Sequence, residues 1–412
     1  MRIAAFVMDP IDELNLKKDS TLAMIRAAQG RGWDIRYLRQ RDLFYRDERP
    51  WGFMRTLSLS DRFAQRLDPA VFHLPVERMR AGYYSDKYFV RAREILLADH
   101  HRPRVTMQVF SKTHAFLGGM DEAVAMLKLC AVDWDDVVVH ALYDGDEVEP
   151  WETVLLIEGP YDAFAHLETL YLGVIARRTK VGTNTRRVVE AARPKEVMFF
   201  PARHDLWLVQ TGDGYAAHVA GAIGVSTDAQ ASWWGSEGVG TVPHALIAAY
   251  HGDTVRATLK FAEHMPESVR VITLVDFEND SVGTSLACAR ALGERLYGVR
   301  LDTSEMLVDK SVVGQMGSFK PTGVTPQLVW NVRSALDRDG FTHVKIVVSG
   351  GFDVEKIRRF EELEVPVDAY GVGSSLFQGR YDFTADVVLV DGKPCAKEGR
   401  VFRPNPRLER VL

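Results

Sequence analysis

The sequence has few cysteines, no excess of basic residues and no long apolar run. Its 412 residues include three cysteines, Cys130, Cys288 and Cys395, which lie far apart and form neither a CxxC pair nor an even disulfide framework. We therefore expect no zinc site, no secreted disulfide scaffold and a reducing, cytoplasmic location. No run of about 18 apolar residues occurs, which argues against a membrane span.

Charge and composition narrow the class further. The formal net charge of -5 argues against a general nucleic-acid binder, since such proteins are usually basic. With 46% hydrophobic and 26% charged residues the composition is that of an ordinary globular protein, and the length allows two or three domains. Residues 1–9 lack the apolar core and cleavage site of a signal peptide.

The first 60 residues predict a small β-α-β unit. Residues 2–8 and 34–38 are typical of strands, and a helix between them is expected to start at Asp19-Ser20 and end near Gly30. The mixed, Arg- and Asp-rich stretch that follows is interpreted as a connection, with 61–82 as the linker. One isolated unit of this size cannot bury much core.

The next region, 83–190 together with about 385–412, predicts a smaller α+β domain. Ser85 or Asp86 would cap a helix, residues 104–112 alternate as a strand does, and a long helical pattern covers 161–176. A basic stretch at 177–195 follows, either as a solvated helix face or as a face for an anionic ligand.

From 191 to 384 strands and helices alternate, as in a parallel sheet or barrel. The expected strands are 196–200, 238–241, 269–276, 298–302, 344–349 and 368–372. The expected helices are 251–264, 280–295, 325–338 and 354–362. Roughly 190 residues are few for eight strands, so we predict a distorted, incomplete α/β barrel.

Functional residues of parallel α/β folds lie where strands end. Asp276 and Asp302 follow two expected strands, where carboxylates could accept bonds from sugar hydroxyls, hold Mg²⁺ or stabilise oxocarbenium charge. Helix N-capping is the alternative for both. Arg300 could be the ion-pair partner of Asp302 or could clamp a ligand oxyanion.

The last two strands end in glycine-rich turns. Glycines allow close approach of the backbone, and N–H groups at the following helix starts can hold a phosphate. The residues concerned are Ser349, Gly350, Gly351, Gly371, Gly373 and Ser374. Two such turns in neighbouring terminal strands favour a phosphate site over ordinary tight turns.

Two further segments carry candidate chemistry. His244 follows Gly-Thr241-Val-Pro and precedes an apolar run, which places an imidazole at a strand-to-helix junction as a possible phosphoryl acceptor or general base. Phe200 and Arg203 follow the strand at 196–200, where a ring and a guanidinium could hold a planar aromatic carboxylate. Structural roles are the alternative for each.

Together these motifs resemble the nicotinate phosphoribosyltransferases, which are type II phosphoribosyltransferases, from about residue 83 to the C-terminus. The carriers are Ser-Asp-Lys-Tyr at 85–88, Gly-Pro-Tyr at 159–161, Glu168-Thr169, Phe-Pro-Ala-Arg at 200–203, Gly-Val-Ser-Thr at 224–227, Gly-Thr-Val-Pro-His at 240–244, Arg-Leu-Asp-Thr at 300–303, Ser-Gly-Gly-Phe-Asp at 349–353 and Gly-Val-Gly-Ser at 371–374.

The resemblance implies formation of nicotinate mononucleotide and pyrophosphate from nicotinate and phosphoribosyl pyrophosphate, with Mg²⁺ and with ATP as co-substrate through a phosphohistidine, His244. It implies that Phe200 stacks on the pyridine ring, that Arg203 lies near its carboxylate or the phosphates, and that the paired glycines hold the 5′-phosphate. Asp276, Arg300 and Asp302 would line the ribose and pyrophosphate, with both aspartates as Mg²⁺ candidates. Tyr88 would reach the ring from a second subunit, which implies a homodimer with shared active sites.

Ser226 helps to choose the substrate. Relatives that use nicotinamide place an Asp where Ser226 falls, and a serine can donate to a carboxylate that an aspartate would repel. The rival of the same fold is a quinolinate or nicotinamide phosphoribosyltransferase, for which the basic stretch 177–195 could supply a second carboxylate contact. A non-catalytic regulator that binds phosphoribosyl pyrophosphate is the rival of another class.

Two departures from the family pattern stand out. The second arginine of an Arg-Arg pair is replaced by His204, and Asp-Ser-Gly-Asp is replaced by Asp302-Thr-Ser-Glu305. The second departure puts one expected contact to Mg²⁺ or pyrophosphate in question. Residues 1–60 instead resemble the opening of bacterial glutathione synthetases, without the ATP-grasp domain, so we assign them no ligase activity.

Overall fold

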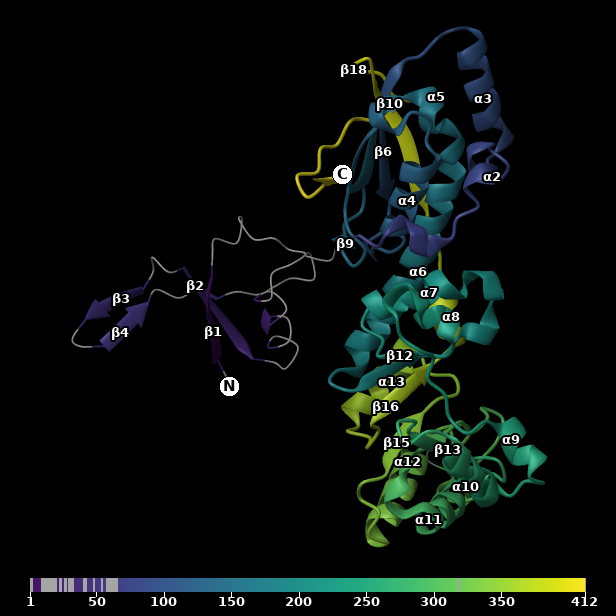
Figure 1. The fold of residues 1–412 in the computed structure, drawn as a ribbon. Coiled ribbons are helices and arrows are strands. Elements are labelled where there is room, and N and C mark those ends of the chain that lie inside the picture. Colours follow the sequence, from purple (N-terminus) through teal and green to yellow (C-terminus); the bar gives the residue numbers. More distant parts are fainter. Residues whose placement is uncertain are drawn as a thin grey trace. The chain divides into compact units, whose positions relative to one another are not determined.

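The computed structural model describes residues 3–8, 21, 24, 25, 28, 33–39, 43–46, 49–52, 55–56, 66–317 and 319–411. The chain separates into two compact units, Met1–Leu67 and Asp68–Leu412, each described here by itself (Figure 1). None of the helices within these described ranges is both long and apolar enough to span a bilayer.

The first unit contains the expected β-α-β arrangement. Strand β1 (Ile3–Val7) pairs in parallel with β2 (Asp34–Leu38), and β5 (Arg55–Thr56) pairs antiparallel with β2. Strands β3 (Leu43–Arg46) and β4 (Arg49–Gly52) form a hairpin. Helical residues between β1 and β2 bury Ile25 and Ala28 against Ile35 and Tyr37, so the described core of this unit is small.

The second unit begins with an antiparallel sheet covered by helices. Its strand order is β18 (Lys393–Pro394), β17 (Phe383–Val390), β6 (Arg104–Ser111), β10 (Thr153–Pro160), β8 (Val138–Ala141) and β19 (Glu409–Arg410). A two-stranded pair, β7 (Ala115–Phe116) with β9 (Glu147–Val148), lies nearby. The helices of this half are α2 (Val76–Arg80), α3 (Lys87–Ala98), α4 (Met120–Cys130), α5 (Tyr161–Phe164) and the start of α6 (Glu168–Ala192).

The start of α3 agrees with expectation in position but not in its bonds. Asp86 is the N-cap residue, yet neither its side chain nor that of Ser85 makes a capping bond, because both are engaged elsewhere. The Ser85 hydroxyl donates to the carbonyl of His166, and the Asp86 carboxylate accepts from the Thr169 hydroxyl at 2.8 Å. Long-range bonds thus replace the local cap. Within the segment expected as a linker, Val76–Arg80 is helical and buries Met79 in the core of this half.

The second half is a curled parallel sheet with helices outside it, which confirms the predicted incomplete α/β barrel. The strand order is β12 (Gly224–Val225), β11 (Glu196–Phe199), β16 (Ala369–Val372), β15 (Lys345–Val348), β14 (Leu296–Leu301) and β13 (Val271–Leu274). The helices are α7 (Gln210–Val219), α8 (Asp228–Ala231), α9 (His244–Ala249), α10 (Thr254–His264), α11 (Ser281–Leu292), α12 (Pro326–Arg338) and α13 (Val354–Glu362).

The expected strand at 238–241 does not form. This glycine-rich segment lies between the two edges of the sheet and makes one backbone bond to each: Val239 N–H donates to Val225 at 2.7 Å, and Val242 N–H donates to Ile272 at 2.9 Å. Three glycines before Pro243 make this segment unfavourable for continuous β-pairing. The segment therefore connects the two edges of the sheet by single hydrogen bonds, and the barrel is not closed by a strand here.

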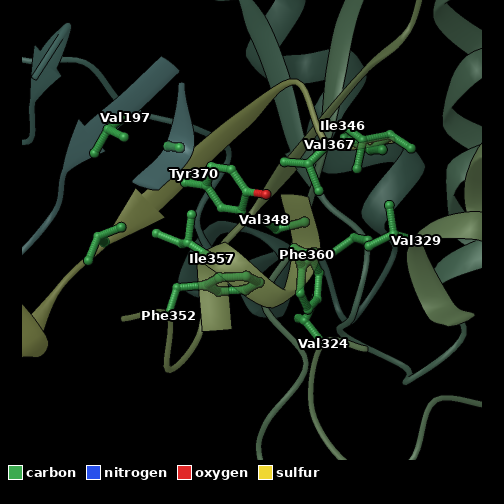
Figure 2. Packing of buried hydrophobic residues seen from close by; sticks show 14 of the residues in the cluster. Val197, Val324, Val329, Ile346, Val348, Phe352, Ile357, Phe360, Val367 and Tyr370 are labelled. Atoms are coloured by element: carbon green, nitrogen blue, oxygen red, sulfur yellow. The ribbon is translucent and has the colours of Figure 1, made fainter. Parts of the chain in front are cut away.

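The strands of the half-barrel are buried on both faces, as parallel strands usually are. On the outer face the aromatic rings of Phe352, Phe360 and Tyr370 pack together (Figure 2). The ring of Phe352 meets that of Phe360 edge-on, with centroids 5.0 Å apart, and lies tilted against that of Tyr370, with centroids 5.5 Å apart. The inner face is a smaller cluster of Met198, Ile272, Val347 and Ala369, with Phe200 and Tyr297 against it. The inner cluster is the floor beneath the strand ends.

The first arginines of the basic stretch 177–195 are committed to ion pairs, while Arg187 and Arg193 are exposed. Arg178 is buried and donates to Glu122 at 3.1 Å and to Asp213 at 2.6 Å. Arg177 donates to Asp213 at 2.7 Å and to Asp205 at 2.7 Å. Together they tie α6 to α4, to α7 and to the loop after β11.

Candidate active site at the strand ends

Strand register explains why distant residues meet. Leu274 pairs with Arg300, Arg300 with Val347, and Val347 with Ala369. Side chains of a strand alternate, so residues two positions further face the same side. That rule brings Asp276, Asp302, Ser349 and Gly371 to one row at the carboxyl edge, above the inner cluster.

Arg300, two residues before Asp302 on the same strand, lies beside this row and contacts two of its residues. Its Nε donates to Ser349 Oγ at 2.8 Å and its Nη1 donates to Thr241 Oγ1 at 3.3 Å. Its Nη2 lies 3.5 Å from Asp302 Oδ2, and the Ser349 hydroxyl donates to Asp302 Oδ1 at 2.7 Å. The Arg300 guanidinium also lies 5.2 Å from the centroid of the Phe200 ring. The expected ion pair with Asp302 therefore forms, inside a larger network.

His244 begins α9, directly after Pro243, so the expected helix start is confirmed, although the segment before it is not a strand. Its Nε2 lies 3.1 Å from Asp276 Oδ1, and the Asp276 side chain is only 9% exposed whereas that of His244 is 45% exposed. The hydrogen bond to Asp276 raises the pKa of His244, burial opposes this, and the negative charges of Asp276 and Asp302 raise it further. The imidazole is thus oriented by a fixed carboxylate and remains accessible.

Neither aspartate of the row is a helix cap. The N-cap of α11 is Asp280, which accepts from Gly283 N–H at 3.0 Å, and α12 is capped by Thr325. The carboxylates of Asp276 and Asp302 are therefore available for contacts with side chains or a ligand at the strand ends. Among the described residues no group of three or more His, Cys, Asp or Glu side chains is arranged to hold a metal ion.

The glycine turns form a cradle, by which we mean Gly350, Gly351, Gly371 and Gly373. A methyl group at Gly371 would lie 2.8 Å from two ring carbons of Phe200, and one at Gly373 would lie 3.1 Å from Cε1 of His204. Gly350 and Gly351 have φ of +83° and +67°, a conformation that favours glycine. Gly351 is exposed and Gly350 is partly exposed at this edge, whereas Gly371 is buried against the Phe200 ring.

The remaining predicted residues surround this centre. Ser226 follows β12, and its hydroxyl donates to the Phe199 carbonyl at 3.1 Å. Arg203 is exposed on the short 3₁₀ helix Ala202–His204, next to Phe200, and Ser374 begins the 3₁₀ helix Ser374–Phe377 beside Gly373. The structure thus gathers these strand-end candidates at one mouth.

Tyr88 is the exception. It lies on α3, at the end of the second unit opposite β13 and α9 (Figure 1). Its side chain is 63% exposed, and its ring contacts that of Phe89 at 4.2 Å. Tyr88 and His244 of the same chain therefore do not form one site.

Sequence reasoning missed one cation at the cradle. Lys356 lies in the first turn of α13, and its Nζ donates to the Gly350 carbonyl at 3.2 Å. Burial lowers the pKa of Lys356, while Glu305 and Asp353 act in the opposite direction. The signal available in the sequence was its position three residues after the N-cap Asp353, which accepts from Lys356 N–H.

Comparisons with known proteins agree with this architecture. A family model of the prokaryotic glutathione synthetase N-terminal domain matches residues 1–115, and one of the quinolinate phosphoribosyl transferase N-terminal domain matches residues 86–179. The chain is 51% identical over 96 residues to a glutathione synthetase of Pseudomonas aeruginosa, covering 22% of this chain and 30% of that protein.

The longer matches cover the second unit. The chain is 30% identical over 263 residues to nicotinate phosphoribosyltransferase pncB1 of Mycobacterium tuberculosis, which is 62% of this chain and 54% of that protein. It thus spans about half the length of the curated relatives it matches. The crystal structure of nicotinate-nucleotide pyrophosphorylase from Pyrococcus furiosus superposes with a TM-score of 0.70 and 33% identity, covering 82% of this chain and 85% of that one. With the row of strand-end side chains and the glycine cradle in place, we conclude that the chain belongs to the same type II phosphoribosyltransferase family as this pyrophosphorylase, and that it resembles nicotinate phosphoribosyltransferases.

Proposed function

We propose that the protein is a nicotinate phosphoribosyltransferase of NAD salvage. The ring nitrogen of nicotinate attacks C1 of phosphoribosyl pyrophosphate, the bond from C1 to the pyrophosphate oxygen breaks, and nicotinate mononucleotide and pyrophosphate are released. The observation that carries this proposal is the His244–Asp276 pair beside the Arg300–Asp302–Ser349 network. It offers an oriented imidazole, a guanidinium and two carboxylates above one cradle.

The pyridine ring is assigned to the side of the mouth that Phe200 forms. Phe200 supplies a face for stacking, with the Arg300 guanidinium 5.2 Å from its ring centroid. Arg203 and the Ser226 hydroxyl are the donors for the nicotinate carboxylate, and Ser226 must turn its hydrogen away from the Phe199 carbonyl to serve. A serine at this place favours a carboxylate over an amide as the ring substituent.

Departure of pyrophosphate leaves positive charge on the ribose. Asp276 and Asp302 are placed to accept from ribose hydroxyls and to stabilise that charge. Each aspartate has an oxygen oriented by His244 or Ser349, which fixes its direction. The two carboxylates fit Mg²⁺, which commonly takes one or two carboxylates together with substrate phosphates; when bound, Mg²⁺ would neutralise charge on the departing pyrophosphate.

ATP coupling is the second part of the proposal. Because Nε2 of His244 is bonded to Asp276, Nδ1 is the ring nitrogen free of partners among the described residues. Nδ1 would attack the γ-phosphorus of ATP as ADP leaves, and the pair with Asp276 would stabilise the charge on the ring. Only the neutral imidazole has this lone pair, so the raised pKa of His244 sets the pH above which phosphorylation is fast.

A homodimer completes the proposed site. Tyr88 is exposed and far from the mouth of its own chain, together with exposed Tyr83 and Tyr84 on the preceding turn. A second copy would bring this aromatic group over Phe200 of the first. The cytoplasm is the compartment proposed for the enzyme, where its substrates and ATP are made.

Quinolinate is the second candidate substrate, because a quinolinate phosphoribosyl transferase domain model matches residues 86–179. Quinolinate carries a second carboxylate and needs another cation near the ring. Arg177 and Arg178 of the basic stretch are committed to Asp205, Asp213 and Glu122 instead. That commitment favours nicotinate.

A substrate assay tests the proposal. The full chain is incubated with nicotinate, nicotinamide or quinolinate plus phosphoribosyl pyrophosphate and Mg²⁺, with and without ATP, and the mononucleotide is identified. We expect nicotinate to be used and ATP to stimulate the wild type. His244→Ala should keep basal transfer and lose the stimulation. Turnover of quinolinate with release of carbon dioxide would favour the second candidate, and absence of all turnover would leave a binding protein.

A further inference from the structure

An acidic side chain lies on the proposed phosphate cradle. Glu305 stands in the loop after β14, and a methyl group built on Gly351 would collide with its Oε1. On its other side, a methyl group at Gly323 would lie 3.4 Å from the Cα of Glu305. Gly351 and Gly323 have φ of +67° and +77°, so both favour glycine and leave room for this carboxylate.

The charges around Glu305 are those of a site for anions. Lys356 donates to the Gly350 carbonyl at 3.2 Å, and its ammonium lies 4.2 Å from the centroid of the Phe352 ring. Glu305 interacts electrostatically with Lys356, and so does Lys320 with the opposite sign. Glu305 is therefore one of two carboxylates, with Asp353, whose charge acts on a half-buried lysine beside the glycine turn, and it reaches Gly351 without a direct ion pair to Lys356 within the described ranges.

A carboxylate and a phosphate cannot both occupy this space. Each is an anion that would use the same glycine turn and the same ammonium, and two anions at close range repel each other. A phosphate monoester carries more charge than a carboxylate and has three acceptor oxygens, so it is the stronger ligand for Lys356.

We propose that Glu305 is a displaceable internal anion of the 5′-phosphate cradle. Its carboxylate lies over Gly351 until a phosphate monoester displaces it, and the Lys356 ammonium, which is held at the Gly350 carbonyl, then pairs with the phosphate. Glu305 thereby weakens the binding of every anion to the cradle, and it favours dianionic phosphates over anions of lower charge. This inference rests on the proposed function, which assigns the glycines to the phosphate.

The family resemblance makes the opposite prediction for this position. An aspartate of the Asp-Ser-Gly-Asp pattern stands where Glu305 does, and a role as ligand for Mg²⁺ or pyrophosphate would make loss of the carboxylate harmful. Removing the charge of Glu305 therefore separates the two roles: phosphate binding should tighten if Glu305 is a displaceable anion, and activity should fall if Glu305 is a ligand for Mg²⁺ or pyrophosphate.

The experiment measures binding of inorganic phosphate by isothermal titration calorimetry to the full chain, without Mg²⁺, and the KM for phosphoribosyl pyrophosphate. Glu305→Gln keeps the shape and removes the charge. Glu362→Gln, an exposed glutamate at the end of α13, makes the same change in net charge away from the cradle. We expect Glu305→Gln to bind phosphate about tenfold more tightly, equivalent to ~1.4 kcal/mol, and to lower the KM, with Glu362→Gln unchanged.

Weaker or unchanged phosphate binding by Glu305→Gln would overturn the proposal. Equal tightening in Glu362→Gln would overturn it too, since net charge alone would then explain the effect. Lys356→Gln should lose phosphate affinity in either background, and unaltered binding there would remove Lys356 from the site. If phosphate tightens as expected but no pyridine substrate turns over, the cradle stands and only the proposed reaction fails.

Discussion

Adding one methyl group at Gly371 tests whether Phe200 and the cradle form one site. In Gly371→Ala the new methyl would lie 2.8 Å from Cδ2 and Cε2 of the Phe200 ring and 3.4 Å from Cβ of Ser349. Ordinary carbon contacts are about 3.5–4.0 Å, so the ring must retreat by roughly 1 Å. Ser349 can stay where it is, and the strain therefore falls on the ring.

The magnitude follows from two general costs. Overpacking of one methyl costs about 1–3 kcal/mol, and misplacement of a substrate-holding group by ~1 Å can cost up to about a hundredfold in rate. We expect kcat/KM for nicotinate to fall about ten- to hundredfold, because the ring is displaced, and the melting temperature to fall by several degrees, because of the overpacking cost. Steady-state kinetics and thermal unfolding measure the two effects separately.

Two controls make this prediction sharp. Gly173→Ala adds the same methyl in α6, where nothing lies within 4 Å of it, and should leave kcat/KM unchanged and stabilise the helix by up to about 1 kcal/mol. In a Phe200→Ala background the methyl at Gly371 has space, so its additional effect should nearly vanish. Kinetics of Gly371→Ala within twofold of wild type, or an undiminished effect without the ring, would refute the reasoning.

Three further results are expected. Asp276→Asn removes the main cause of the raised His244 pKa, so the rise of ATP stimulation with pH should move to lower pH; a midpoint that does not move, or moves up, contradicts the pairing. Tyr88→Ala and His244→Ala, each impaired alone, should regain activity when mixed and co-refolded, since hybrid dimers contain one intact shared site; no regain would argue against sharing. Arg178→Met leaves the buried carboxylate of Glu122 without its partner and Asp213 with Arg177 alone, and it should cost about 3–5 kcal/mol in urea unfolding, whereas Arg380→Met, whose side chain is 86% exposed, should change little.

Strand ends were the most predictable part of this protein. Apolar runs followed by Asp276, Asp302, Ser349 and Gly371 could be located from sequence because buried parallel strands are nearly continuous in Val, Ile and Leu. Pairing of these strands in register then brings the residues together, and that step needed only the alternation of βα units. The position of His244 at a helix start was equally local.

The features that could not be predicted from the sequence depend on contacts between residues that are distant in the chain. A basic stretch predicts an exposed face, yet Arg178 is buried because Glu122 and Asp213, distant in sequence, neutralise it. The strand expected at 238–241 does not form, because its glycine-rich backbone lies between two sheet edges and bonds to each only once. Glu305 was visible only as a departure from the family pattern, and its contact with Gly351 required the fold.

Helix α6 has a consequence for how the second unit can be divided. Its early residues, such as Tyr171 and Ile175, belong to the core of the antiparallel sheet, and its later ones, such as Val181 and Val188, belong to the core of the half-barrel. Over its 25 residues, about 37 Å, it is one rod shared by two hydrophobic interiors. Neither half is an independent module: cutting the gene between them would strip one interior of a wall, so recombination or truncation here should yield aggregates rather than a folded fragment.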